Sequence, residues 1–96
     1  MNLPWTDEEL QLAVQSYLQM LKHQQNKTPF VKAEINRQLQ GKIKRSKGSI
    51  EKRFQNISSI FHAHGLPFVQ GYVPLNNVGA TNEEKIWQLI QQLQND

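Results

Sequence analysis

Four stretches of the chain repeat apolar residues at intervals of three and four, and each is bounded by residues that commonly start or end helices. This spacing places the apolar side chains on one face of an α-helix, whereas a half-buried strand would alternate every second residue. We therefore predict an all-α fold with a three-helix unit, a loop or short hairpin, and a C-terminal helix. The predicted helices cover residues 6–24, 29–40, 47–64 and 82–94.

Residues with helix-capping chemistry determine these bounds. A threonine followed three residues later by glutamate forms a capping box, and this pattern occurs at Thr6 and at Thr81. Proline after Thr28 suits the first position of a helix, and glycine commonly follows the last helical residue. The expected N-caps are Thr6, Thr28, Ser46 and Thr81, and the expected helix ends are Gly41 and Gly65.

A chain of 96 residues without cysteine must be held together by its hydrophobic core. Residues 1–96 can form one domain, and neither a disulfide nor a thiolate zinc site can add stability. No apolar run approaches the length of about 20 residues that a membrane span needs, and the start lacks the pattern of a signal peptide. We expect a cytoplasmic protein without membrane contact, and an N-terminal module of a longer protein.

Basic residues are concentrated in the middle of the chain. Residues 22–53 contain ten of the eleven lysines and arginines against only Glu34 and Glu51, a net charge of +8, and the rest of the chain carries −5. Such asymmetry in a small domain predicts a surface for a polyanion. A merely solvated basic face is the alternative.

The predicted helices 29–40 and 47–64, joined by a short basic connector, fit a helix-turn-helix arrangement whose last helix enters the major groove of duplex DNA. Lysine and arginine bind phosphates, whereas amides and hydroxyls contact base edges. The predicted phosphate contacts are Lys32, Lys42, Lys44, Arg45, Lys47 and Arg53, with Lys27 beside them. The predicted base contacts are Lys52, Gln55, Asn56 and Ser59, on the outward face of the third helix. For Arg53 an ion pair with another helix is an equal alternative.

Nothing in the sequence indicates catalysis, a metal or a cofactor. His62 and His64 are two residues apart, so on a helix they point about 200° away from each other, and we expect them only to interact favourably with the helix C-terminus. Two roles stay open for Phe68 and Tyr72, which either join the core or face a ligand. The alternative function is protein interaction or oligomerisation, through the apolar stripe of Ile86, Leu89, Ile90 and Leu93.

Two segments carry a resemblance to known families. Residues 5–10 (WTDEEL) and 44–53 (KRSKGSIEKR) resemble the Myb/SANT-like and homeodomain-like helical pattern. A longer series of segments resembles an N-terminal module of bacterial restriction-type proteins, and in that family the module often precedes an HNH endonuclease domain. The series consists of the two segments above together with residues 17–21, 32–39, 54–58 and 65–74. The resemblance implies the duplex-recognition part of a restriction-modification or other bacterial defence nuclease, with modified DNA as one candidate target. It implies a following nuclease domain as partner, but the chain itself lacks the nuclease motif. A second copy of the chain is the other expected partner, through the apolar stripe of the C-terminal helix.

Overall fold

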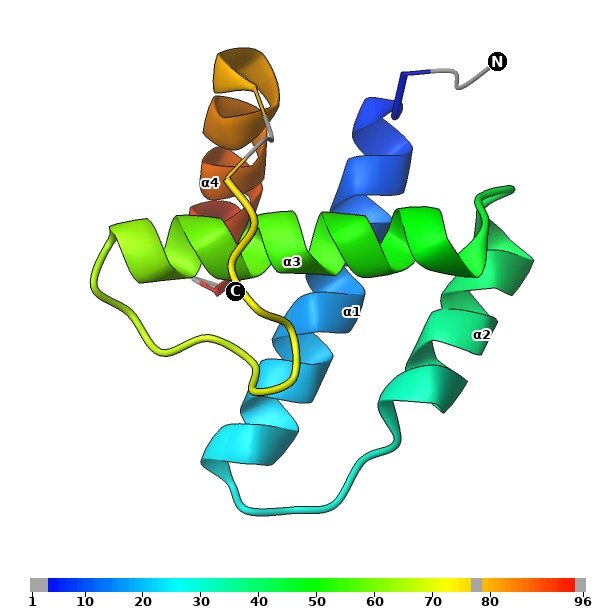
Figure 1. Ribbon diagram of the computed structural model, residues 1–96, viewed down its shortest axis with the longest axis vertical. Coiled ribbons are helices and arrows are strands. Elements are labelled where there is room, and N and C mark those ends of the chain that lie inside the picture. The colour runs from blue at the N-terminus through cyan, green and yellow to red at the C-terminus, as the bar shows by residue number, and fades with distance from the viewer. Residues whose placement is uncertain (1–3, 77–78, 95–96) are drawn as a thin grey trace.

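The computed structural model describes residues 4–76 and 79–94, without the side chain of residue 80, and contains four α-helices and no strand in these ranges. The helices are α1 (Asp7–Gln25), α2 (Lys32–Lys42), α3 (Lys47–Ala63) and α4 (Ala80–Gln94). In Figure 1, α3 crosses α1, with α2 near the start of α3 and α4 near its end. The all-α prediction is confirmed, and the described part of residues 66–79 is a loop rather than a hairpin.

One core joins all four helices. The apolar stripes of α1 and α3 meet at Tyr17, whose ring stacks on Phe61 with centroids 5.4 Å apart and lies 6.2 Å from Phe54. Ile86 and Ile90 of α4 are completely buried in the same cluster. The stripe on α4 therefore packs within this chain, as an integral part of the fold.

Local capping chemistry starts α1 and α3 as predicted. Thr6 Oγ1 accepts a hydrogen bond from Glu9 N at 3.1 Å, and Glu9 Oε1 accepts one from Thr6 N at 2.9 Å, which confirms the capping box. Ser46 Oγ accepts from Ser49 N at 3.1 Å. At the end of α3, Gly65 has a φ of 68°, and its amide donates to His62 O, as in a Schellman motif.

The predicted bounds of α2 are wrong at its start and slightly short at its end. Thr28 does not cap α2, because its hydroxyl donates to His23 O at 3.2 Å and lies 2.7 Å from His23 Nδ1. Pro29 therefore precedes the helix, which begins at Lys32 after Val31. Gly41 does not end it either, because Ile43 N still donates to Leu39 O at 3.0 Å.

The predicted start of α4 is also wrong, because Thr81 lies inside the helix. Glu83 N donates to Gly79 O at 2.9 Å, which places the first helical bond ahead of the threonine. Gly79 has a φ of 81°, a left-handed conformation that glycine adopts without steric cost, so the chain can turn into α4 earlier than the capping box suggests.

The connection from α3 to α4 folds back over α3, and we call its residues 66–76 the strap. Figure 1 shows this yellow segment passing across α3. The buried Tyr17 hydroxyl accepts from Val69 N at 2.9 Å and lies 2.7 Å from Ser58 Oγ. Gln24 donates to Phe68 O at 3.0 Å, and its side-chain oxygen accepts from Gln70 N at 2.8 Å. The strap is thus bonded directly to α1, and through the Tyr17 hydroxyl it is linked to Ser58 of α3.

Candidate nucleic-acid interface

The strap covers the C-terminal half of the α3 face that we expected to contact bases. Asn56 is 6% exposed and donates from Nδ2 to Leu75 O at 2.8 Å, and Ser59, 8% exposed, donates to Asn76 Oδ1. The prediction that these two side chains face outward is wrong. Helical periodicity gives only the direction in which a side chain points, and here that direction is occupied by a distant segment.

The N-terminal half of the same α3 face stays open. Lys52 is exposed, and Gln55 is partly exposed, with no side-chain hydrogen bond in the described part of the chain. The backbone oxygen of Gln55 accepts from Leu75 N at 3.1 Å, so the strap reaches α3 next to this residue. Of the four predicted base contacts, Lys52 and Gln55 therefore remain accessible to a ligand.

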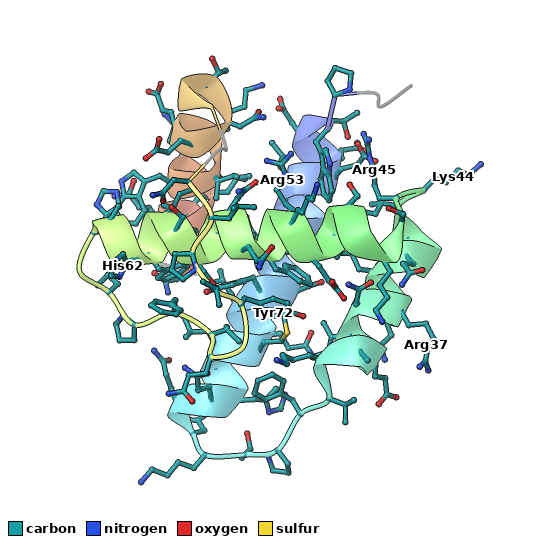
Figure 2. All side chains as sticks on the ribbon, viewed as in Figure 1. Arg37, Lys44, Arg45, Arg53, His62 and Tyr72 are labelled. Atoms are coloured by element: carbon teal, nitrogen blue, oxygen red, sulfur yellow. The ribbon has the colours of Figure 1, made fainter. Side chains whose placement is uncertain are left out.

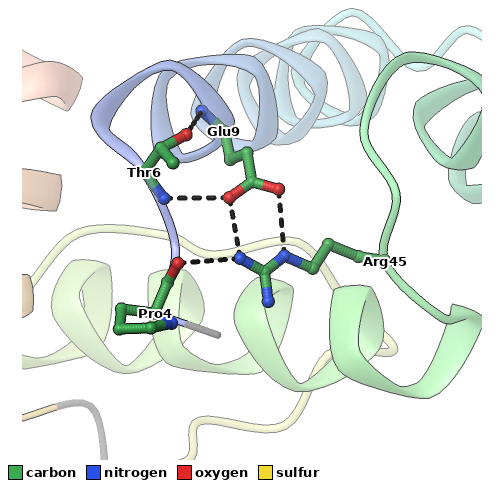
Figure 3. Close-up of polar contacts among 4 residues, drawn as sticks. All are labelled: Pro4, Thr6, Glu9 and Arg45. Carbon is green, nitrogen blue, oxygen red and sulfur yellow. Dashed lines mark hydrogen bonds and ion pairs between the residues drawn. The ribbon is translucent and has the colours of Figure 1, made fainter. Parts of the chain in front are cut away.

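Arg45 is engaged by α1 rather than directed at a ligand. Its Nε and Nη2 donate to the two carboxylate oxygens of Glu9 at 2.9 and 2.8 Å, and Nη2 also donates to Pro4 O at 2.8 Å (Figure 3). This paired hydrogen bonding lowers the pKa of Glu9 to about 2, chiefly through Arg45, and raises that of Arg45. Arg45 ties the connector to α1, so we withdraw it from the phosphate set.

Arg53 forms a contact that neither of its two predicted roles included, and its role as a phosphate contact stays a prediction. Its guanidinium lies over the Trp5 ring, 4.8 Å from the centroid, while Arg45 lies 5.2 Å from the same ring. Its Nε is buried without a hydrogen-bond partner among the described residues, and no described carboxylate pairs with it. Burial and the neighbouring charge of Arg45 lower the pKa of Arg53. Contact with the aromatic ring thus replaces the predicted ion pair.

Five exposed cations remain around the junction of α2 and α3, and none forms an ion pair within the described ranges. We call this set the basic corner: Arg37, Lys42, Lys44, Lys47 and Lys52. Figure 2 shows Arg37 and Lys44 extending away from the body of the protein on the side of α2. Arg37 was not predicted as a contact, although its position among the basic residues of the second helix was a usable signal.

A groove adjoins the basic corner, between α2, the first turns of α3 and the strap. Its volume is about 280 Å³. The lining residues are Lys32, Ala33, Asn36, Lys47, Glu51, Gln55, Gly71 and Tyr72. The groove brings together Lys32, Lys47 and Gln55, which were predicted as contacts. It also includes Glu51, which was not assigned to the site, and Tyr72, whose role was left open between core and ligand.

Several contacts shape this groove. Asn36, which is buried, donates to Lys47 O at 3.3 Å and accepts from Gln40 at 2.8 Å, so it joins α2 to the start of α3. Lys32 Nζ lies 5.2 Å from the centre of the Tyr72 ring. Gly71 has a φ of 97°, and a Cβ there would collide with Lys32 Nζ, so the absence of a side chain lets the lysine lie against the strap.

Tyr72 belongs to both the core and the groove. It is 7% exposed, and its ring lies 5.2 Å from that of Phe54, yet it forms part of the groove wall. Burial, with a smaller effect of the negative charge on Glu51, raises the pKa of Tyr72 to about 12. Phe68 is partly buried and meets His62 edge-on at 5.8 Å, so it packs on α3.

The comparisons with known proteins add no relative. No family model, no curated protein and no solved structure matches this chain. The geometry of the basic corner and groove is therefore the basis for assigning a function. Across residues 4–76 and 79–94, no group of three or more potential metal-binding side chains occurs, and no helix is long and apolar enough for a bilayer span.

Proposed function

We propose that this protein binds duplex DNA through the basic corner, with α2 and α3 acting as a helix-turn-helix pair. In this proposal the open N-terminal half of α3 enters the major groove, where the first residues of a recognition helix commonly contact bases. Arg37, Lys42 and Lys44 bind backbone phosphates, and Lys47 and Lys52 lie closer to the bases.

The observation that carries the proposal is the accessibility of five cations over residues 37–52, none of which forms an ion pair with another described residue. Cations neutralised by carboxylates within the fold would have little attraction for phosphate, as Arg45, which is paired with Glu9, illustrates. Binding of DNA phosphates by free cations releases condensed counterions, which gives an affinity even before any base is recognised.

Anisotropy titrations of a labelled duplex across a series of salt concentrations test the proposal. We expect the logarithm of the association constant to fall linearly with the logarithm of salt concentration, by about 0.9 per phosphate contact. Lys44→Gln or Arg37→Gln should weaken binding to every duplex and make this slope shallower by about one contact.

Lys85→Gln is the matched control, because it removes the same charge from α4, where Lys85 pairs with Asp7 at 3.0 Å. It should leave the salt slope unchanged. If Lys85→Gln weakens binding as much as Lys44→Gln, net charge rather than the basic corner drives association. If the protein binds no duplex at low salt, the proposal is wrong.

The restriction-type resemblance extends this proposal to modified DNA, which the same titration addresses with methylated, hydroxymethylated and phosphorothioated duplexes beside plain ones.

The alternative of protein interaction has less support, because two of the four residues in its apolar stripe, Ile86 and Ile90, are buried within this chain.

A further inference from the structure

Glu51 is an unexpected residue in a surface for a polyanion. It lies on the wall of the groove between two lysines, and it forms no ion pair or hydrogen bond within the described part of the chain. It also lies beyond the first turn of α3, so it does not have the helix-starting role that an acidic residue there would have. A carboxylate in this position repels phosphate and needs another explanation.

The neighbour of Glu51 on the helix surface is Gln55, because residues four apart lie on the same face. Both side chains line the groove, and neither is bonded to another described residue. Lys47, one turn before Glu51, and Lys32, across the groove from α3, supply positive charge on its sides. The groove thus combines an acceptor and an amide with flanking cations.

We infer that Glu51 and Gln55 are the base-recognition pair of this protein, with Glu51 accepting a hydrogen bond from the N4 amino group of a cytosine and Gln55 pairing with an adjacent adenine. This inference rests on the proposed binding of duplex DNA. In the major groove, cytosine presents an amino donor where thymine presents a carbonyl oxygen, and adenine presents the donor and acceptor that a glutamine amide can pair with.

The negative charge of Glu51 makes affinity depend on the sequence of the duplex, whereas the attraction of the lysines for phosphates does not. On a duplex that offers no amino donor, the carboxylate meets acceptor atoms and neighbouring phosphates, and it lowers affinity. On a duplex with cytosine at the right position, the hydrogen bond offsets that repulsion. Glu51 therefore acts mainly against the wrong sequences, which is an effective way to gain specificity.

Selection from a randomised duplex pool, followed by titration of single duplexes at fixed salt, tests this inference. We expect a preference for cytosine at one position beside adenine. Glu51→Ala removes both the acceptor and the charge, so it should lower affinity for the preferred duplex by about tenfold and raise affinity for duplexes lacking that cytosine. A preferred duplex whose cytosine is replaced by an analogue without the 4-amino group should bind the native protein about tenfold more weakly. Glu51→Ala, which has no acceptor, should lose most of this discrimination.

Glu34→Ala is the matched control, since Glu34 is exposed on the first turn of α2 and does not line the groove. It should change affinity for all duplexes alike. If Glu51→Ala also raises affinity uniformly, or if no sequence preference exists, the inference is overturned while salt-dependent DNA binding still stands. If no duplex binds at all, the inference and the proposed function both fail. Circular dichroism of each variant verifies that it folds.

Discussion

At the scale of single residues, Glu9 bonds to two segments that are far apart in the sequence. Its carboxylate accepts from Thr6 N in the capping box and from the Arg45 guanidinium, with the Glu9 side chain 17% exposed and that of Arg45 13% exposed. The same acidic residue thus starts α1 and fastens the connector between α2 and α3. The N-terminal half of α3 is oriented in part by this pair.

The Glu9–Arg45 pair predicts a loss of stability in acid. The pKa of Glu9 falls from its ordinary 4.5 to about 2 on folding. Between these values the unfolded chain binds more protons than the folded one, so this contribution is complete above pH 4.5 and is lost as the pH falls toward 2. Denaturant unfolding of the native protein across this range should show that the free energy of unfolding falls with pH. The pair should account for about 1 to 3 kcal/mol of this decrease.

Glu9→Gln should lack this part of the pH dependence, since glutamine can still complete the capping box but carries no charge. Glu8→Gln, at an exposed position beside it, is the control and should follow the native curve. If the free energies of unfolding of the native protein and of Glu9→Gln fall in parallel from pH 5 to pH 2, the role assigned to the pair is wrong.

At the scale of elements, the strap and the C-terminal half of α3 stabilise each other. Asn56→Ala removes the donor to Leu75 O and leaves a partly buried carbonyl without that partner, so it should lower the free energy of unfolding by about 1 to 3 kcal/mol. Urea denaturation measures this change. Gln55→Ala, one residue earlier and without a side-chain hydrogen bond to any described residue, should change stability by less than about 0.5 kcal/mol. An Asn56→Ala variant with native stability but altered sequence preference would restore Asn56 as a base contact.

At the scale of the whole molecule, α4 completes the core instead of forming a separate attachment. Ile90 is fully buried, so Ile90→Ala should destabilise the entire domain by about 2 to 5 kcal/mol. Tryptophan fluorescence and far-ultraviolet circular dichroism should report one coincident unfolding transition, shifted to lower denaturant. Lys85→Gln, which removes only the exposed ion pair to Asp7, should cost less than about 1 kcal/mol. Two separate transitions would contradict a single cooperative core.

The sequence by itself determined the helical class and the starts of α1 and α3. The signals were local, because a cap such as Ser46 and the residue that it bonds are three positions apart. The same local signals failed at Thr28 and Thr81. The Thr28 hydroxyl bonded to the end of α1, and Gly79 allowed α4 to begin before Thr81.

Only the tertiary structure decided which residues of the candidate site are accessible. Periodicity placed Asn56 and Ser59 on one face of α3 but could not show the strap lying over them. It could not pair Arg45 with Glu9, 36 positions away, or bring Tyr72 to the wall of the groove. Charge and amphipathic pattern are properties of neighbouring residues along the chain. Accessibility depends on contacts between distant segments, and the energy of those contacts arises only when the whole chain packs together.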